Sequence, residues 1–447
     1  MSASFPQGEQ RINARRKMDR PVLQVALDFV DLERAIEVAG EAVEGGVDWI
    51  EVGTPLIKSE GLNAVREMRR AFPGHKIIAD MKTIDAGRTE VETAAKAGAD
   101  IIDVLGASSD ATIAECVDAA HNYGCEIVVD MIEVEDPVRR AKAAEAAGAN
   151  YIAVHTAIDV QMVGGDPFEV LGKVAAAVDI PVACAGGVNS ETAATAVAHG
   201  ARIVIVGGAI IKSADARAAA AEIREAMDTG VSRSTTLYKR VDETNIREAL
   251  AMVSTANISD AMHRTGILPG IRPVVPGVKL VGPVVTVRTY PGDWAKPVEA
   301  IDVAGEGDVI VIDAGGQGPA MWGELATHSA LQRKVAGVVA DGAVRDTPDI
   351  IELRYPVFTR LIMSNAGEPK GFGEINVPIR IAGVLIHPGD WAVGDDDGVI
   401  ILPKARAAEF ANRAMDVLEK ENRLRGEIQR GSTLSQVAYL EKWEKRK

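Results

Sequence analysis

Four segments of the sequence share one pattern: GVDWIEV at residues 46–52, GADIIDV at 98–104, GANYIAV at 148–154 and GARIVIV at 200–206. They begin 52, 50 and 52 residues apart, so the chain repeats a unit of nearly constant length. Each segment follows an alanine-rich stretch with helical periodicity, and its glycine stands where a helix would end in a left-handed cap. A short β-branched run follows the glycine. The repeat therefore predicts four helix–strand units.

Four further strand candidates lie between the repeats: VLQVALD (22–28), KIIADMK (76–82), EIVVDM (126–131) and IPVACAG (180–186). Eight strands that alternate with helices over about 210 residues are typical of a (β/α)8 TIM barrel. A doubly wound open sheet is the alternative, but units of even length favour a closed barrel. In such a barrel the catalytic side chains stand at the carboxyl ends of the strands.

The bulk composition narrows the class of protein. A chain of 447 residues exceeds what one core usually organises, so two α/β domains are expected. The net charge of −15 argues against a nucleic-acid binder, and no apolar run reaches the length of a membrane span. Three cysteines without paired spacing, and an N-terminus without a signal-peptide segment, indicate a cytoplasmic protein. Residues 1–19 are expected to be a solvated tail with a basic cluster.

Charged side chains and glycine pairs follow the predicted strands. They are Asp28, Glu51, Asp80, Lys82, Asp85, Asp103, Asp130, His155, Gly186–Gly187 and Gly207–Gly208. Any single one could cap a helix or pair in a loop, and for Asp103 and Asp130 that interpretation stays open. As a set they are costly to bury without partners, so together they indicate a functional site.

The residue types suggest the chemistry of this site. Asp80 and Lys82 alternate along one strand and should both point into the barrel mouth. Glu51 and Asp80 come from adjacent strands, and two carboxylates with bound water suit Mg²⁺, or Mn²⁺ in its place. Lys82 can hydrogen-bond a developing oxyanion, and His155 is the natural proton carrier. The two glycine pairs occupy the usual phosphate position of a barrel.

The segments LQVALD, EVGTPLIKSEG, IIADMKTIDAG, HTAIDVQ, CAGGVN and IVGGAI, in this order, resemble the orotidine 5′-phosphate decarboxylase suprafamily over residues 20–228. Within it they are similar to the 3-hexulose-6-phosphate synthase branch. The resemblance implies a lyase of the ribulose monophosphate pathway. Such an enzyme fixes formaldehyde by adding the enediolate of ribulose 5-phosphate to it. It assigns Mg²⁺ to Glu51 and Asp80, enediolate stabilisation to Lys82 and acid–base chemistry to His155. It also makes Asp28 a substrate contact, and places Asp85 near a neighbouring subunit's site in a homo-oligomer.

Two decarboxylase branches are the alternatives. Orotidine-phosphate decarboxylases share the D-x-K-x-x-D element but work without a metal, and Glu51 argues against them. The 3-keto-L-gulonate-6-phosphate decarboxylases carry an arginine three residues after the histidine of strand 6, where this chain has Ile158. That difference favours the synthase.

The polar stretch at 229–240 is predicted to be a linker, and residues 241–447 a second α/β domain. Its predicted strands are PVVTVRTY, DVIVIDAG, VAGVVADG and GVIILP, and its predicted helices lie around 242–265, 322–335 and 405–425. The run GDDDG near residue 396 is interpreted as a hairpin turn, not as a metal site.

One group of residues in this domain indicates chemistry. Glu324 precedes Arg345 with 20 residues between them, and Asp346 and Asp349 follow directly. Arginine suits a substrate carboxylate, Asp346 suits a hard metal ion, and backbone N–H groups around Gly323 and Leu325 could hold the other end of an anion. Alternatively, Asp346 and Asp349 only decorate the start of a helix.

The spacing E-x20-R-D-x2-D and the late segment HPGDWAVGDDDGVIILP resemble the family of 4-hydroxy-4-methyl-2-oxoglutarate aldolase and the ribonuclease regulator RraA, over residues 240–425. Catalytic members keep the acidic residue that the regulators tend to lack, and Glu324 is that residue. The resemblance implies Asp346 as Mg²⁺ ligand, Arg345 as the group that binds carboxylate and enolate, and Glu324 as an acid or base acting through water. A bifunctional enzyme, with an oxo acid as second substrate, is thus one hypothesis. The other is a barrel enzyme with a non-catalytic regulatory or oligomerising module.

Overall fold

The computed structural model describes Met18 and residues 20–155, 168–235, 241, 244–438 and 440. The chain divides into two compact units. The first consists of Met1–Tyr238 together with Glu421–Lys447, and the second of Lys239–Lys420. The sequence-based division placed everything after residue 240 in one domain, whereas the described residues after 420 group with the first unit.

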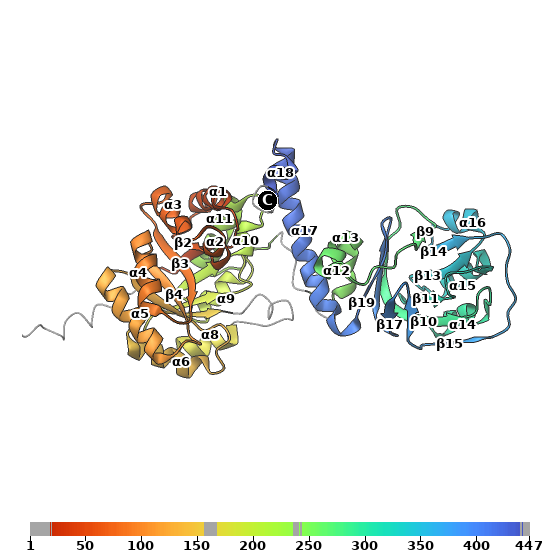
Figure 1. Ribbon diagram of the computed structural model, residues 1–447, viewed down its shortest axis with the longest axis horizontal. Helices are drawn as coiled ribbons and strands as arrows, with labels where there is room; N and C mark the ends of the chain where they lie inside the picture. The colour runs from red at the N-terminus through yellow and green to blue at the C-terminus, as the bar shows by residue number, and fades with distance from the viewer. Residues whose placement is uncertain are drawn as a thin grey trace, which may run out of the picture. The chain divides into compact units, whose positions relative to one another are not determined.

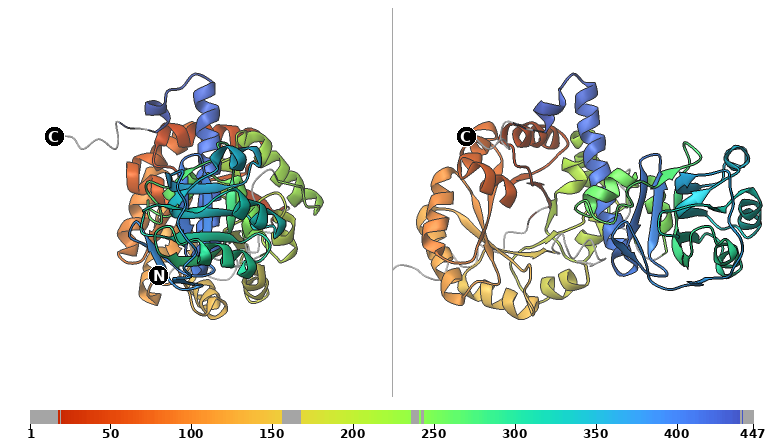
Figure 2. Two further views of the ribbon diagram at one scale, coloured as in Figure 1. Left: turned by 90° about the vertical axis from the view of Figure 1, so that its right-hand side faces the viewer. Right: turned by 45° about the vertical axis from the view of Figure 1, so that its right-hand side comes forward.

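The first unit is a closed barrel of eight parallel strands in chain order, ringed by helices (Figure 1 and Figure 2). Closure is made by the first and last strands, where Val22 pairs with Ile203. The predicted barrel is confirmed, and the open-sheet alternative is wrong. The strands are β1 Val22–Leu27, β2 Trp49–Val52, β3 Lys76–Thr83, β4 Ile101–Leu105, β5 Glu126–Asp130, β6 Tyr151–His155, β7 Val182–Ala185 and β8 Ile203–Val206.

The helices of this unit lie where the alanine-rich stretches predicted them. Gly98 and Gly148 end two of them with left-handed backbones, at φ 109° and 101°, as the repeat indicated. The helices are α1 Leu32–Glu44, α2 Thr54–Glu60, α3 Asn63–Ala71, α4 Gly87–Ala97, α5 Asp110–Tyr123, α6 Pro137–Ala147, α8 Phe168–Ala175, α9 Ala193–Ala198, α10 Gly208–Ile211 and α11 Ala216–Thr229, with α18 Leu434–Val437 near the chain end.

Two apolar layers stabilise the barrel. The larger one packs the outer faces of the strands against small helix residues such as Ala35, Ala39 and Ala42. The smaller one fills the barrel interior with residues such as Ile78, Ile101 and Ile203, all at most 2% exposed. Full burial of one such isoleucine contributes about 1.5–3 kcal/mol. Because apolar side chains fill this layer, the charged residues are left to the carboxyl ends of the strands.

The second unit is built on a mixed nine-stranded sheet with the order β19-β18-β10-β11-β13-β14-β9, in which β12 also pairs with β13 and β15 with β10. Its central strands β10, β11, β13 and β14 are parallel. The strands are β9 Arg272–Pro273, β10 Leu280–Thr289, β11 Val309–Asp313, β12 Ala320–Trp322, β13 Gly337–Val344, β14 Val357–Ile362, β15 Gly373–Ile375, β18 Trp391–Asp395 and β19 Gly398–Leu402, with the hairpin β16 Ile379–Ile381 and β17 Val384–Ile386 beside the sheet.

The helices of the second unit are α12 Ile246–Met252, α13 Thr255–Ala261, α14 Ala295–Val303, α15 Glu324–Gln332 and α16 Thr347–Glu352. A further helix, α17 Ala407–Gln429, begins in this unit and continues into the last residues of the first. The single helix expected around 242–265 is wrong in one respect. The chain breaks between α12 and α13, because Ser254 leaves the helical conformation and forms a capping box with Asn257.

Two expectations concern segments outside the cores. The GDDDG run is a tight turn that joins the antiparallel strands β18 and β19, with Asp395 opposite Gly398, so the hairpin interpretation is confirmed. Within the described ranges, no helix is both long and apolar enough to cross a membrane. Of the predicted linker, residues 231–235 form neither helix nor strand, and residues 236–240 lie outside the described residues.

Candidate active site

The barrel strands deliver their charged residues to one mouth, as predicted. Strand β2 pairs with β1 and β3 so that Glu51 lies opposite Ala26 and Ile78, and Asp80 follows on β3. Asp103, Asp130 and His155 come from the next three strands, β4, β5 and β6. Strand register therefore brings these acidic residues and His155 to the same end of the barrel.

Lys82 is the centre of this site. Its Nζ lies 2.5 Å from Asp80 Oδ1, 3.1 Å from Asp130 Oδ2 and 3.7 Å from Asp103 Oδ2. Burial by itself lowers the pKa of Lys82, but the carboxylates of Asp103, Asp80 and Asp130 outweigh burial and raise it. The ammonium group therefore stays charged and keeps its hydrogen-bond donors.

The backbone at Lys82 is unusual for a strand. Its φ is +50°, in the left-handed region, and the pairing of β3 with β4 shifts register between Ala79 and Thr83. Such a conformation costs a residue with a side chain about 1 kcal/mol or more. Strained residues cluster at functional sites, and here the strain accompanies the approach of Lys82 to three acids.

Asp130 and His155 form a pair beside Lys82. The Nδ1 atom of His155 lies 2.9 Å from Asp130 Oδ2, and the backbone N–H of Ile132 donates to Asp130 Oδ1 at 2.9 Å. Burial raises the pKa of Asp130, but the hydrogen bond and charge of His155 outweigh it, and the net pKa is lowered. The role of Asp130, left open by the sequence, is thus to hold the histidine ring and to contact Lys82.

The remaining acidic residues of the mouth, Glu51, Asp103 and Asp28, lie close to other negative charges, and their pKa values are raised. Burial, and then the charge of Asp80, raise the pKa of Glu51 to about 8 although Lys82 opposes the shift. Burial also raises the pKa of Asp103, whose Oδ1 has no hydrogen-bond partner among the described residues. The pKa of Asp28 is raised first by loss of water around its carboxylate and second by Asp80, although the residue as a whole is exposed.

This charge balance fits a divalent cation. Five carboxylates (Asp28, Glu51, Asp80, Asp103 and Asp130) face Lys82, His155 and, at Asp28, Lys212, which still leaves uncompensated negative charge when all are ionised. The described residues contain no ready-made group of three or more His, Cys, Asp or Glu ligands. Mg²⁺ does not need one, because it commonly takes one or two carboxylates and keeps several waters.

The glycine pairs lie at the ends of β7 and β8. Gly186 and Gly187 have φ of +100° and +71°, which excludes most other residues. Gly207 lies beside Asp28, since a Cβ on it would stand 3.6 Å from Asp28 Oδ2. A Cβ on Gly208 would meet Lys212 Nζ at 3.4 Å. Backbone N–H groups of glycines at this edge of the mouth suit an anion.

Asp85 does not join this cluster. It lies in the loop after β3, is exposed, and makes no hydrogen bond or ion pair with the described part of this chain. The other predicted barrel residues lie together at the mouth.

Three contributors escaped the sequence analysis. Gln24 donates to Glu51 Oε2, Thr54 donates to Asp80 Oδ2 through both its N–H (3.2 Å) and its hydroxyl (2.6 Å), and Lys212 acts electrostatically on Asp28. A buried glutamine inside an apolar strand was a readable signal, because it needs a polar partner. Thr54 and Lys212 carried no comparable signal.

The second unit brings four predicted residues together where β12 and β13 end. The backbone N–H of Glu324 donates to Asp346 Oδ2 at 3.2 Å, and Arg345 Nε lies 3.5 Å from the same oxygen. A Cβ on Gly323 would stand 2.5 Å from this oxygen, so glycine permits the approach. His328, which the sequence did not single out, lies 3.0 Å from Glu324 Oε1.

The sequence also allowed a second interpretation, in which Asp346 and Asp349 only cap or flank the start of a helix. Asp346 is the N-cap residue of α16 by position, but its side chain makes no capping hydrogen bond and reaches α15 instead. Asp349 and Leu325 are exposed, and the Leu325 side chain does not enter the group. The side chain of Asp346 therefore does not cap α16. Asp349 fits the second interpretation, because it lies in the first turn of that helix.

Comparisons with known proteins agree with this division. The pattern of the "Orotidine 5'-phosphate decarboxylase / HUMPS family" matches residues 21–223, and that of "Aldolase/RraA" matches residues 255–401. The 3-hexulose-6-phosphate synthase of Bacillus subtilis is 43% identical over 209 residues, which are 46% of this chain and 99% of that protein. The synthase of Mycobacterium gastri is 43% identical over 207 residues, with 46% and 99% covered.

Among solved structures, the RNA-processing inhibitor RraA from Thermus thermophilis is 28% identical and covers 34% of this chain and 93% of its own, with a TM-score of 0.32. The two synthases are matched along almost their whole length by the barrel of this chain. Through its barrel, the chain belongs to the orotidine 5′-phosphate decarboxylase / HUMPS family, and it carries an RraA-like domain in addition.

Proposed function

We propose that the barrel is a Mg²⁺-dependent aldehyde-lyase that condenses formaldehyde with ribulose 5-phosphate to 3-hexulose 6-phosphate. The observation that carries the proposal is Lys82 held among Asp80, Asp103 and Asp130, with the Asp130–His155 pair beside it. The names of the relatives, which are over 40% identical, support 3-hexulose 6-phosphate as the product.

Each residue of the mouth has a task in this reaction. His155, held by Asp130, takes the C1 proton of the sugar phosphate, and the Lys82 ammonium hydrogen-bonds the developing enediolate oxygen. C1 then attacks the formaldehyde carbon, and the proton ends on the new hydroxyl. Glu51 and Asp80 would hold Mg²⁺, which when bound supplies polarisation of the sugar carbonyl. The glycines after β7 and β8 bind the phosphate through their backbone N–H groups.

A decarboxylase acting on 3-keto-L-gulonate 6-phosphate is the competing activity for this barrel. The distinguishing position, Ile158, lies outside the described residues, so the difference rests on its identity in the sequence. An apolar side chain there cannot supply the cation expected in that branch. The proposal therefore favours the synthase.

The deciding experiment is a coupled assay with formaldehyde and ribulose 5-phosphate, run with and without EDTA. We expect product only when Mg²⁺ or Mn²⁺ is present, and recovery when metal is restored in excess over the chelator. Full activity in EDTA would contradict the metal assignment. Release of CO2 from 3-keto-L-gulonate 6-phosphate without formaldehyde addition would replace the synthase with the decarboxylase.

A second function is favoured for the RraA-like domain by one observation, the convergence of Glu324, Arg345 and Asp346 around a glycine. We infer a metal-dependent lyase acting on an oxo acid such as oxaloacetate. The contacts to the Asp346 carboxylate are made by Oδ2, which leaves Oδ1 for a hard cation, and the half-exposed Arg345 can receive a substrate carboxylate. A regulatory module without activity is the alternative.

A further inference from the structure

The last described residues of the chain belong to the barrel unit although they follow the second unit in sequence. They comprise the end of α17 from Glu421 and the short helix α18. This segment lies outside residues 21–223, the part shared with the barrel family. It is therefore an addition of this chain to the common barrel.

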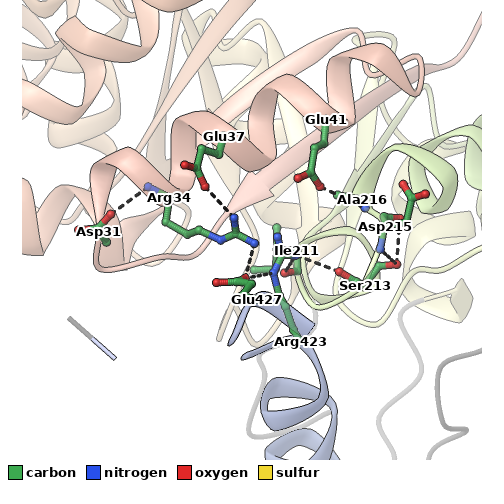
Figure 3. Close-up of polar contacts among 10 residues, drawn as sticks. All are labelled: Asp31, Arg34, Glu37, Glu41, Ile211, Ser213, Asp215, Ala216, Arg423 and Glu427. Carbon is green, nitrogen blue, oxygen red and sulfur yellow. Dashed lines mark hydrogen bonds and ion pairs between the residues drawn. The ribbon is translucent and has the colours of Figure 1, made fainter. Parts of the chain in front are cut away.

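Arg423 is the main contact of this segment. Its side chain is only 8% exposed, and its Nη1 donates to the carbonyl oxygens of Ile211 and, at 3.1 Å, of Ser213 (Figure 3). Ile211 is the last residue of α10, so its carbonyl is one that the helix itself leaves without a partner, and Ser213 lies two residues beyond the helix. One arginine thus fixes both ends of the Ile211–Ser213 loop.

Glu427 holds the arginine in place. Its Oε1 accepts from Arg423 Nε at 3.2 Å and also pairs with Arg34 of α1, which in turn pairs with Glu37 (Figure 3). The Arg34 and Glu427 side chains are 12% and 10% exposed. Two buried guanidinium groups would repel each other without this carboxylate, so the three side chains work as one unit.

Lys212 lies between Ile211 and Ser213, the two residues whose carbonyl oxygens accept hydrogen bonds from Arg423. A Cβ on Gly208 would lie 3.3–3.6 Å from three side-chain atoms of this lysine, so the lysine lies over the glycine loop after β8. The charge of Lys212 also acts on Asp28, at the end of β1. Lys212 thus stands where the substrate phosphate is expected.

We propose that Lys212 is the cation that meets the substrate phosphate, and that Arg423 is a positioning residue that holds Lys212 and the 207–213 loop in place. The identity of the anion rests on the proposed function. The barrel's phosphate site would then be completed by a segment that follows the second domain. Arg423 acts only through the backbone on either side of Lys212.

A double-mutant cycle in the full-length chain tests this proposal. The variants are Lys212→Met, Arg423→Met and their combination, with Arg425→Met as matched control. Arg425 lies on the same helix, is 54% exposed, and pairs only with Glu421 and Asn422 among the described residues. The readouts are KM for ribulose 5-phosphate, KM for formaldehyde, kcat, and the affinity for inorganic phosphate by calorimetry.

Lys212→Met should weaken phosphate binding and raise KM for the sugar phosphate about 30-fold, and Arg423→Met about tenfold, because each removes charge-assisted contacts. The combination should be no worse than Lys212→Met within about twofold, since one residue acts through the other. KM for formaldehyde and kcat should stay within about twofold. Arg425→Met should change none of these values.

Multiplicative losses in the double variant, or equal losses in Arg423→Met and Arg425→Met, would overturn the positioning role. If Arg423→Met does not fold, Arg423→Lys keeps one donor group and should raise KM about threefold without lowering Tm. Calorimetry separates this inference from the proposed function. A wild-type chain that binds phosphate in a Lys212-dependent way but makes no hexulose phosphate would refute only the synthase, whereas a chain that does not bind phosphate would refute the inference.

Discussion

At the scale of single residues, the barrel mouth combines a permanent cation with acids that resist ionisation. Lys82 keeps its proton because three carboxylates surround it, while Glu51 and Asp103 are pushed toward their neutral forms by burial. The same crowding makes the site receptive to a second positive charge. Two consequences are measurable.

Glu51→Gln should stabilise the metal-free protein at alkaline pH. Because the folded-state pKa of Glu51 is raised from 4.5 to about 8, the unfolded chain loses this proton first, and stability falls as pH rises through that window. The variant should match the wild type near pH 4.5 and exceed it above pH 8 by about 2–4 kcal/mol. Urea unfolding in EDTA at several pH values measures this difference, and added Mg²⁺ should shrink it. A constant difference at all pH values would contradict the assignment.

His155→Ala should slow exchange of the substrate C1 proton with solvent deuterium by about 10²–10⁴-fold, the usual size of general acid–base catalysis. NMR of ribulose 5-phosphate without formaldehyde follows the exchange directly. Phosphate affinity should change much less, because the His155 ring is held by Asp130 and the phosphate is assigned to the glycine loops. Undiminished exchange would transfer the role to Asp28.

At the scale of elements, the loop from β2 to α2 must pass close to the end of β1. A Cβ on Gly53 would stand 2.3 Å from Asp28 Oδ1 and 2.8 Å from the Leu27 carbonyl oxygen. The neighbouring Thr54 supplies both hydrogen bonds to Asp80 Oδ2. A glycine at this place therefore allows two strand ends to meet.

Gly53→Ala should lower kcat/KM at least about tenfold, since a misplacement of about 1 Å at a reacting centre can cost about a hundredfold. Gly40→Ala is the matched control, because a Cβ there meets nothing within 4 Å and alanine favours the helix α1. Steady-state kinetics and thermal melts compare the two variants. Equal activity in both would show that Asp28 can move aside without loss.

The elements also show what the sequence could and could not predict. All eight barrel strands were predictable. Seven are short runs rich in branched aliphatic residues with a helix-ending glycine or a charged strand end beside them, and β7 is an apolar run followed by the Gly186–Gly187 pair. The break at Ser254 was not, since the helical periodicity runs on through 242–265 and only the capping box interrupts it. Thr54, which contacts Asp80, and Lys212, which acts on Asp28, could not be predicted either. Their positions depend on how loops fold in space, and no local sequence pattern indicates that.

At the scale of the whole molecule, two candidate sites built from different sets of residues share one chain. The barrel site could be anticipated in detail because strand ends converge in any closed barrel. The packing of Glu421 and later residues on the barrel unit could not, because Arg423 and Glu427 look like ordinary charges of a solvated helix until their partners at Arg34 and Ile211 are known.

The RraA-like domain should decarboxylate oxaloacetate in the full-length chain, even when the barrel carries Lys82→Met. Asp346→Asn should remove most of this rate, and Arg345→Lys should reduce it because a point charge cannot replace paired hydrogen bonds. Pyruvate release measured with lactate dehydrogenase reports the reaction. A wild-type rate no greater than that of free Mg²⁺ would leave the regulatory module as the better account.

The discontinuous barrel unit also sets an order of events during synthesis. Residues 239–420 leave the ribosome between the last barrel strand and Arg423. At about 5–20 residues per second, this delay is on the order of 10–40 s. A nascent barrel can close its eight strands during that time, but its 211–213 loop must wait for Arg423, which is translated only after residues 239–420. If Lys212 and Arg423 act as proposed, messages cut short after residue 420 would yield a barrel that binds phosphate more weakly than the full-length chain does.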